Sequence, residues 1–442
     1  MTDELPQGWT TIPLREVVVA RKGKKPKVLH EIEAPKRVPY LLIDQMEGRP
    51  PRYFTDDPKV TVASKDDVLV VWDGSIGKCA TGLEGAVGST IVALKPMGVA
   101  SGFLEAFIKN VRRTLVETSR GTGLQHINQE VFWELGFPLA PFAEQHRIVV
   151  KLEKLLRKVD DCQQRLEKIP VLIKRFRQSI LAAACSGHLT VDWRQNHPTP
   201  DAAGQAYRAL RPKQLFNLDA AFEITALPET WEYVPVGNVC GFQQGMQIAK
   251  ATRFREAGPN RLPILRIGNY ANGFSEDVDF VEINKETLIA ERDDIILTRT
   301  GETRGKVLTG YRGVFHNNTF CLNYEKRLLL RKYLISWLDT AAVQEFIRQR
   351  SGRSAQPDLT HKAFGPCPFP LAPLAEQQEI VRRVEALFAL ADQIEARYAK
   401  AKAYIEKLTP SLLAKAFRGE LVPQDPNDEP ASSLLLRLKQ QH

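Results

Sequence analysis

Basic and amide side chains stand beside glycine at matching places in the two halves of this sequence. One such segment is SRGTGLQHINQ at residues 119–129, and its counterpart is RQRSGRSAQPD at residues 348–358. Arginine and glutamine form paired hydrogen bonds with guanine and adenine edges, and glycine lets the backbone approach a phosphate. Any one of these side chains alone is better explained as solvated surface charge. As a set, the segments predict binding of nucleic acid.

The candidate DNA-binding residues occur in both halves. They are Lys22, Lys24, Lys25, Lys78, Arg120 and Gln125 in the first half and Gln247, Arg266, Arg299, Arg304, Arg350 and Arg353 in the second. The chain has 61 Lys and Arg against 52 Asp and Glu, which gives a formal net charge of +9. This balance permits a polyanionic partner without requiring one.

Residues that could carry out catalysis or hold a cofactor form no recognisable set. The segments GSIGK at 74–78 and GETRGK at 301–306 lack the glycine spacing of a phosphate-binding loop and the hydroxyl residue that follows its lysine. The Asp-Asp pairs at 66–67 and 293–294 are interpreted as turns before buried strands, because adjacent residues of a strand point to opposite faces. No Asn-Pro-Pro or Asp-Pro-Pro string suggests a methyl-donor site. We therefore expect no catalytic residue, no metal site and no cofactor.

Cysteine usage and apolar runs indicate a cytoplasmic protein. The six cysteines are scattered and form no CxxC pair, so neither a zinc site nor a disulfide framework is indicated. The N-terminal segment MTDELPQGWT lacks the charged and apolar regions of a signal peptide. No apolar run approaches the roughly 18 residues that a membrane-spanning helix needs.

The elements that must position these residues are duplicated. PLAPFAEQHRIVVKLEKLL opens residues 138–189, and PLAPLAEQQEIVRRVEALF opens residues 370–421, at a constant offset of 232 residues. In both copies apolar residues alternate spacings of three and four, which is typical of a coiled-coil helix with one narrow apolar seam. An ordinary dimerisation helix or a buried hairpin would give the same pattern. Gly187 and Gly419 suit the helix ends, whereas Pro170 and Pro410 predict a kink or break in each helix.

Each long helix follows a globular region of mixed character. The runs VLVVW at 68–72 and IILTR at 295–299 are bounded by Asp and Gly and predict strands, while residues 103–116 and 333–348 predict helices. The first region opens with LPQGW and the second with LPETW. We expect globular domains at 1–140 and 227–372, helices at 141–189 and 373–442 with a tail, and a linker with a short helix at 190–226. The frame is shared while the polar loops differ, as expected for two related domains that bind different ligands.

The chain resembles the specificity subunit of Type I restriction-modification enzymes. The residues that carry the resemblance are the two PLAP helix starts, the helix ends SILAAACSGHLT and SLLAKAFRGELVPQDPNDEP, and the two blocks that combine an Asp-Asp pair with a later Gly-Lys. The resemblance covers nearly the whole chain. It implies an α+β protein with two mixed α/β target recognition domains and two long helices packed as an antiparallel coiled coil, arranged as an internal pseudo-twofold repeat.

The resemblance also implies a function and partners. Each recognition domain would recognise one half of a bipartite, asymmetric DNA sequence, with the helices as the spacer between them. Two methylation subunits and the motor-nuclease subunits would be the protein partners, and the helix starts that carry Glu144, Gln145, Glu376 and Gln377 would take part in partner binding. Two alternatives are a subunit of a modification-only system and a coiled-coil scaffold that binds protein rather than DNA.

Overall fold

The computed structural model describes residues 5–121, 123–198, 203–210, 215–222, 224–266, 278–352 and 358–440. The chain forms two compact units: Met1–Glu167 together with Tyr398–His442, and Lys168–Arg397. Each unit therefore combines one globular domain with helical segments from both copies of the repeat. Among the described residues, no helix is long and apolar enough to cross a membrane.

The domain of the first unit contains three small sheets. One has the strand order β2-β9-β6-β7, another β4-β3-β8-β5, and the third pairs β1 with β10. Their bounds are β1 Thr10–Pro13, β2 Val18–Lys22, β3 Val38–Leu41, β4 Phe54–Thr55, β5 Val62–Ala63, β6 Val68–Val71, β7 Cys79–Ala80, β8 Gly85–Val87, β9 Ile91–Pro96 and β10 Gly136–Leu139. The helices are η1 Leu14–Glu16, α1 Ile43–Met46, α2 Ser101–Glu117, α3 Gln129–Trp133, α4 Phe142–Leu166 and α14 Ala431–Gln440.

The domain of the second unit repeats these sheets strand for strand. Its orders are β12-β19-β16-β17, β14-β13-β18-β15 and β11-β20. The strands are β11 Glu232–Pro235, β12 Cys240–Gln244, β13 Arg261–Leu265, β14 Phe280–Glu282, β15 Ile289–Ala290, β16 Ile295–Thr298, β17 Val307–Leu308, β18 Gly313–Phe315, β19 Thr319–Tyr324 and β20 Pro368–Leu371. The helices are α5 Ile169–Cys185, η2 His188–Thr190, α6 Val191–Asn196, α7 Ala203–Arg208, α8 Val236–Val239, η3 Lys250–Thr252, α10 Arg331–Leu338, α11 Ala341–Arg350 and α12 His361–Phe364. The predicted internal repeat of mixed α and β domains is confirmed.

The central strands are apolar throughout because both of their faces are covered. In β6, Val68 and Val70 belong to the core that includes α2, while Leu69 and Val71 belong to a second core beneath β3 and β8. All four residues of β6 are buried, and so are all four of β16. Since successive side chains of a strand point to opposite faces, an unbroken apolar run is what a strand between two cores requires.

The Asp-Asp pairs before these strands form turns, as the sequence predicts. The Asp67 side chain is fully buried and accepts a hydrogen bond from the Ser64 backbone N–H at 2.7 Å. In the second domain the Asp294 side chain accepts from the Glu291 backbone N–H at 2.8 Å. Among the residues that the structure describes, no group of three or more His, Cys, Asp or Glu side chains is placed to hold a metal ion.

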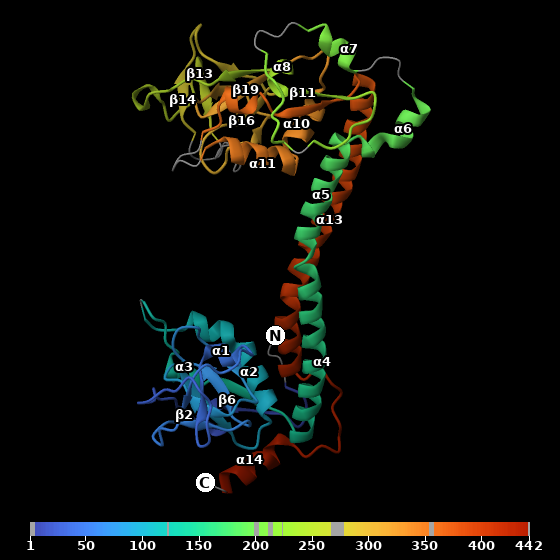
Figure 1. Cartoon of the computed structure of the whole chain (residues 1–442). Coiled ribbons are helices and arrows are strands. Elements are labelled where there is room, and N and C mark those ends of the chain that lie inside the picture. Colours follow the sequence, from blue (N-terminus) through green and yellow to red (C-terminus); the bar gives the residue numbers. More distant parts are fainter. Residues whose placement is uncertain are drawn as a thin grey trace. The chain divides into compact units, whose positions relative to one another are not determined.

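The long helices pair antiparallel within each unit (Figure 1). Helix α13 spans Leu374–Phe417. In the first unit, α4 lies beside the C-terminal part of α13, and Ile148 of α4 belongs to the same core as Leu413 and Phe417. In the second unit, the end of α5 shares a core with the start of α13, where Leu181 lies in the cluster that contains Ile380. The predicted antiparallel helix pairing is therefore confirmed within each unit.

The two helix prolines have different outcomes. The first long helix breaks between Leu166 and Ile169, and Pro170 stands at the second position of α5, where its missing N–H costs no hydrogen bond. Pro410 instead lies inside α13, which continues to Phe417. The helix therefore does not break at Pro410, and of the two expected outcomes the break is wrong. Pro410 is exposed, so water can solvate the carbonyl that loses its helical donor.

Candidate nucleic-acid interface

Three loops of the first domain meet at the ends of β2 and β6. The His126 Nδ1 lies 2.7 Å from an Asp73 carboxylate oxygen, and the Lys22 Nζ lies 3.9 Å from the other. The Gly74 N–H donates to the Gln125 carbonyl at 2.9 Å, and Arg120 and His126 exchange backbone hydrogen bonds. The structure therefore brings together three of the predicted residues, namely Lys22, Arg120 and Gln125. It adds Asp73 and His126, which the sequence did not single out.

The other predicted lysines of the first domain, Lys24, Lys25 and Lys78, lie in two different places. Lys24 and Lys25 are exposed and continue from β2, with the Lys24 N–H donating to the Val87 carbonyl at 3.1 Å. Lys78 pairs with Glu47 at the end of α1, at 2.5 Å, and this hydrogen bond lowers the pKa of Glu47. Lys78 is thus paired with Glu47, which does not belong to the loops that meet around Asp73.

The matching loops of the second domain carry different side chains. Arg299 follows β16 and donates from Nε to Asp358 at 2.7 Å, while its guanidinium stacks over the Phe320 ring at 5.2 Å. The Asn317 carbonyl accepts hydrogen bonds from Arg299 and from Gln244, both at 3.4 Å. Exposed Gln247 stands three residues beyond the end of β12 at Gln244. It directly follows Met246, which exchanges backbone hydrogen bonds with the 315–317 turn. The structure therefore gathers predicted Arg299 and Gln247 around one turn.

A glycine lets each loop approach its neighbouring turn. A Cβ on Gly245 would lie 2.2 Å from the His316 carbonyl oxygen, and one on Gly23 would lie 2.0 Å from the Gly88 carbonyl oxygen. These distances are too short for any side chain, so both positions require glycine. Gly23 and Gly245 follow the ends of β2 and β12, which makes the two loops equivalent in backbone while their side chains differ.

Three arginines of the second domain surround one buried carboxylate. Asp279 is 8% exposed, and its oxygens lie 2.6 Å from Arg266, 3.3 Å from Arg255 and 3.7 Å from Arg253. Arg253 also donates to the Ile248 carbonyl at 2.7 Å. We call Arg253, Arg255, Arg266 and Asp279 the Asp279 cluster. Of these four residues, only Arg266 was a predicted site residue.

Two further predicted arginines, Arg304 and Arg350, make other contacts. Arg304 donates to the Gly301 carbonyl of its own turn at 3.1 Å. Arg350, at the end of α11, pairs with Asp219 at 2.6 Å. Arg353 lies outside the described residues. Contacts of Arg304 and Arg350 with DNA stay predictions.

The Glu-Gln pairs at the helix starts have a structural role that sequence reasoning missed. Glu144, Gln145, Glu376 and Gln377 are each at most 1% exposed. Their side chains are therefore buried within the unit that carries them, and the involvement of the helix starts in partner binding stays a prediction. They cap and connect elements of their own unit instead.

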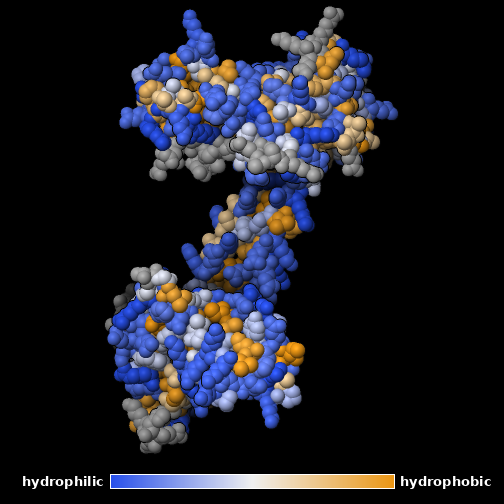
Figure 2. Space-filling model, turned by 60° about the vertical axis from the view of Figure 1, so that its left-hand side comes forward, coloured by the Kyte–Doolittle hydropathy of each residue, from blue (hydrophilic) through white to orange (hydrophobic). Residues whose placement is uncertain are grey.

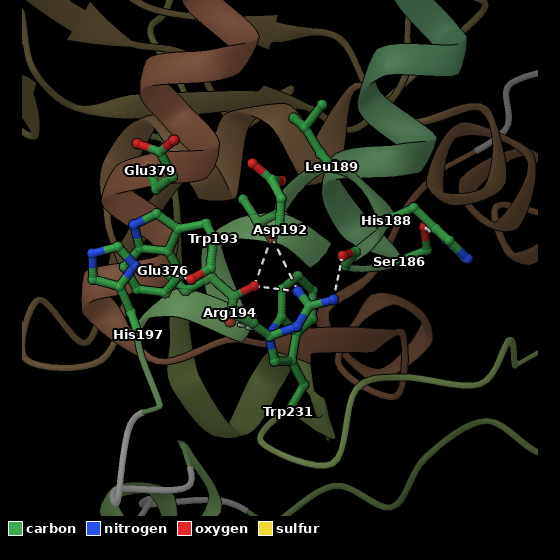
Figure 3. Close-up of polar contacts among 12 residues, drawn as sticks. Ser186, His188, Leu189, Asp192, Trp193, Arg194, His197, Trp231, Glu376 and Glu379 are labelled. Carbon is green, nitrogen blue, oxygen red and sulfur yellow. Dashed lines mark hydrogen bonds and ion pairs between the residues drawn. The ribbon is translucent and has the colours of Figure 1, made fainter.

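In the second unit, Glu376 connects three segments of the chain (Figure 3). It accepts hydrogen bonds from the Trp231 indole N–H at 2.7 Å and the Thr190 hydroxyl at 2.6 Å, and it forms an ion pair with Arg194. Arg194 also donates to the Gly187 carbonyl at 2.6 Å, which satisfies the C-terminal end of α5. We call Glu376, Trp231, Thr190 and Arg194 the helix-start network.

The first unit repeats this arrangement with a neutral donor. Glu144 accepts from the Trp9 indole N–H at 2.9 Å and from the Gln424 amide at 2.8 Å. Gln424 also donates to the Gly419 carbonyl at 2.9 Å, as Arg194 does to Gly187. A tryptophan in LPxxW and a glutamate in the PLAP helix start both recur, so their joint repetition was the sequence signal for this contact.

The adjacent glutamines hold the domain helices. Gln145 accepts from the Ala100 N–H, the N-cap of α2, at 2.9 Å and donates to the Ala140 carbonyl at 2.9 Å. Gln377 accepts from the Leu330 N–H, the N-cap of α10, at 2.8 Å and donates to the Ala372 carbonyl at 2.8 Å. Since a buried backbone N–H without a partner is costly, each glutamine stabilises one helix start.

Comparison with known proteins assigns the family. The sequence pattern of the Type I restriction modification DNA specificity domain matches residues 6–171 and again residues 228–403. The chain belongs to this family. The two matches cover both domains and much of both long helices.

Members of the family align along nearly the full length of the chain. The EcoDI specificity subunit of Escherichia coli is 27% identical over 95% of this chain and 90% of its own length. The EcoKI specificity subunit of Escherichia coli strain K12 is 29% identical over 95% of this chain and 91% of its own.

Solved structures show the same fold. A chain from a structure of the type I R-M system covers 94% of this chain and 99% of its own length, with a TM-score of 0.69 and 18% identity. The HsdS subunit from Thermoanaerobacter tengcongensis covers 95% of this chain and all of its own, with a TM-score of 0.59 and 19% identity. The predicted fold class is confirmed.

Proposed function

We propose that the chain is the DNA-recognition subunit of a Type I restriction-modification complex, in which each globular domain recognises one half of a bipartite target. The observation that carries this proposal is a shared backbone with exchanged side chains. Lys22 and Gln244 are the last residues of the equivalent strands β2 and β12. His126 and Asp358 are likewise equivalent, because each pairs through its backbone with the loop that follows β6 or β16. Amide and guanidinium groups form hydrogen bonds with base edges that ammonium groups do not reproduce, so the two domains are suited to different sequences.

We propose that adenine methylation and cleavage are carried out by partner subunits, two for methylation and others for motor and nuclease activity. Hydrophobic side chains reach the surface along the helices of each unit (orange in Figure 2). The exposed apolar residues of these helices include Phe142 and Val150 in the first unit, and Val171, Leu172, Phe176, Leu390 and Ile394 in the second. Exposed apolar side chains gathered on one element are typical of a protein-protein interface, which supports these helices as the docking surface.

The purified chain is expected to transfer no methyl group to DNA, whereas its complex with the methylation subunits is expected to do so. Labelled methyl donor and DNA from a host that lacks the system provide the assay, with the methylation subunits alone as the control. Transfer by the isolated chain at the rate of the complex would contradict the proposal.

We also propose that helix length sets the spacing between the two half-targets. One heptad added before Pro170 and another after Tyr398 keeps the apolar seam in phase and lengthens the helices by about 10 Å, or about three base pairs. The preferred gap between half-targets is expected to grow by about that amount, blurred by DNA bending.

Methylation of duplexes with graded gaps measures the effect of these insertions. Insertions of three residues serve as the control, because they shift the seam and are expected to impair folding. A folded heptad variant that still prefers the parental gap would show that the helices do not set the spacing.

A further inference from the structure

Among the residues that the structure describes, the Asp279 cluster has no counterpart in the first domain. Backbone hydrogen bonds match Ile264 and Asp279 with Tyr40 and Tyr53, so Arg266 and Asp279 correspond in position to Leu42 and Tyr53 of the first domain. A leucine and a tyrosine at these places cannot form the ion pair seen in the second domain. The cluster is therefore a feature of the second domain's loops rather than of the shared frame.

The cluster lies against the turn that carries the other candidate contacts. His316 follows β18, and burial together with the nearby charges of Arg253 and Arg266 lowers its pKa. The next residue, Asn317, accepts hydrogen bonds from Gln244 and Arg299 through its carbonyl. Arg253 also donates to the Ile248 carbonyl, two residues after Met246, which exchanges backbone hydrogen bonds with residues 315 and 317. The Asp279 cluster therefore lies near the turn that contacts Gln244 and Arg299.

The three arginines of the cluster differ in how far their side chains are buried. The Arg253 side chain is 19% exposed and is anchored to Ile248. The side chains of Arg266 and Arg255 are 40% and 76% exposed, while Asp279 between them is buried. Arg253 and the buried carboxylate are thus the inner members of the cluster, and Arg266 and Arg255 are its more exposed members.

A guanidinium fixed by a carboxylate is suited to a base rather than to a phosphate. A phosphate is contacted adequately by a flexible lysine, whose ammonium acts as a point charge. Guanine presents O6 and N7 side by side in the major groove, and an arginine must offer two N–H groups in one plane to reach both. Fixing the side chain beforehand removes most of the ordering cost of that contact.

We propose that Asp279 is a positioning residue that holds the Arg266 guanidinium for a paired hydrogen bond with a guanine in the second half-target. This inference rests on the proposed function. Arg255 shares the carboxylate and adds positive charge beside the contact. Asp279 acts through Arg266 and does not itself contact the base.

The test uses the full chain expressed with its methylation subunits in a host of known genome, with methylated adenines mapped by sequencing. Asp279→Asn keeps the shape of the side chain but removes its charge, and Arg266→Ala removes the donor. Both are expected to relax one guanine position of the second half-target by about 5- to 150-fold, the range for one paired base contact, and to leave the first half-target unchanged. Arg312→Ala is the matched control, because Arg312 is an exposed arginine of the same domain whose Nε donates to Glu291 at 3.0 Å.

Four results would overturn the inference while leaving the proposed function intact. The parental second half-target could contain no G·C pair, or Asp279→Asn and Arg266→Ala could leave the base preference unchanged. Arg312→Ala could relax the same position equally, or the two variants could weaken binding to all DNA sequences alike with a smaller salt dependence. The last would assign Arg266 to phosphate. Loss of all methylation with a lowered melting temperature would assign the cluster to folding and would also overturn it. Absence of any methylation by the parental complex would instead overturn the proposed function, and this inference with it.

Discussion

Replacing residues 227–369 by the corresponding segment of a related specificity subunit is expected to change one half of the methylated sequence completely and leave the other half intact. The physical reason is that the second domain has its own loops and two small cores of its own, while its larger core packs against α5 and α13. The helix-start network attaches it through Trp231 of the LPxxW segment. Both junctions lie beside segments that recur in the first domain, namely LPxxW and PLAP. A related subunit that carries both segments therefore supplies a domain that makes the same contacts with the long helices.

Genome-wide mapping of methylated adenines measures the result of the exchange. The reciprocal exchange of residues 1–140 is the control and is expected to change only the opposite half-target. A change in both half-targets after either single exchange would show that the domains do not recognise DNA independently.

The second large effect is on stability, in the variant Glu376→Ala. Arg194 loses its ion-pair partner while its side chain is 19% exposed, and the Trp231 and Thr190 donors lose their acceptor. Removal of one partner from a largely buried ion pair costs about 3–5 kcal/mol, because the other charge stays in a poorly solvated place. We expect a loss of that order in the free energy of unfolding of the second unit.

Urea unfolding followed by tryptophan fluorescence measures this loss. Glu385→Ala on the same helix is the control, since its ion pair with Lys332 is more than half exposed on both sides and is expected to contribute about 1 kcal/mol or less. Arg194→Gln imitates the first unit, where Gln424 is the donor, and is expected to cost less than Glu376→Ala. Equal stability of the Glu376→Ala and Glu385→Ala variants would rule out the network as the main attachment of the helix start.

The parts of the fold that could be predicted from sequence are those with a local periodic signal. The buried run of β6 and the paired helices each follow from the spacing of apolar residues. Pro170 was correctly placed at a helix break because proline fits the first turn of the helix that follows. At Pro410 the helix does not break, since tertiary packing at Leu413 and Phe417 holds the last turns of α13.

The candidate site was predicted less well because its contacts join residues distant in sequence. Arg266 and Arg299 stood out by type, but nothing in the sequence indicated that Asp279 holds one and Asp358 the other. His126 did not stand out in the sequence, because Asp73, whose carboxylate lies 2.7 Å from it, is 53 residues away along the chain. The structural role of the buried Glu-Gln pairs was missed, because polar residues at a helix start are usually solvated, whereas Glu144 and Glu376 accept hydrogen bonds from Trp9 and Trp231.

The central claim is that the two domains recognise two separate half-targets. The measurement that tests it most directly is sequencing of methylated adenines in the genome of a host that expresses the chain with its methylation subunits and has no other such system. The account predicts a single asymmetric sequence in two specified parts, separated by a gap of constant length and unspecified composition. Methylation at one continuous sequence, or at two half-sequences whose separation varies freely from site to site, would contradict it.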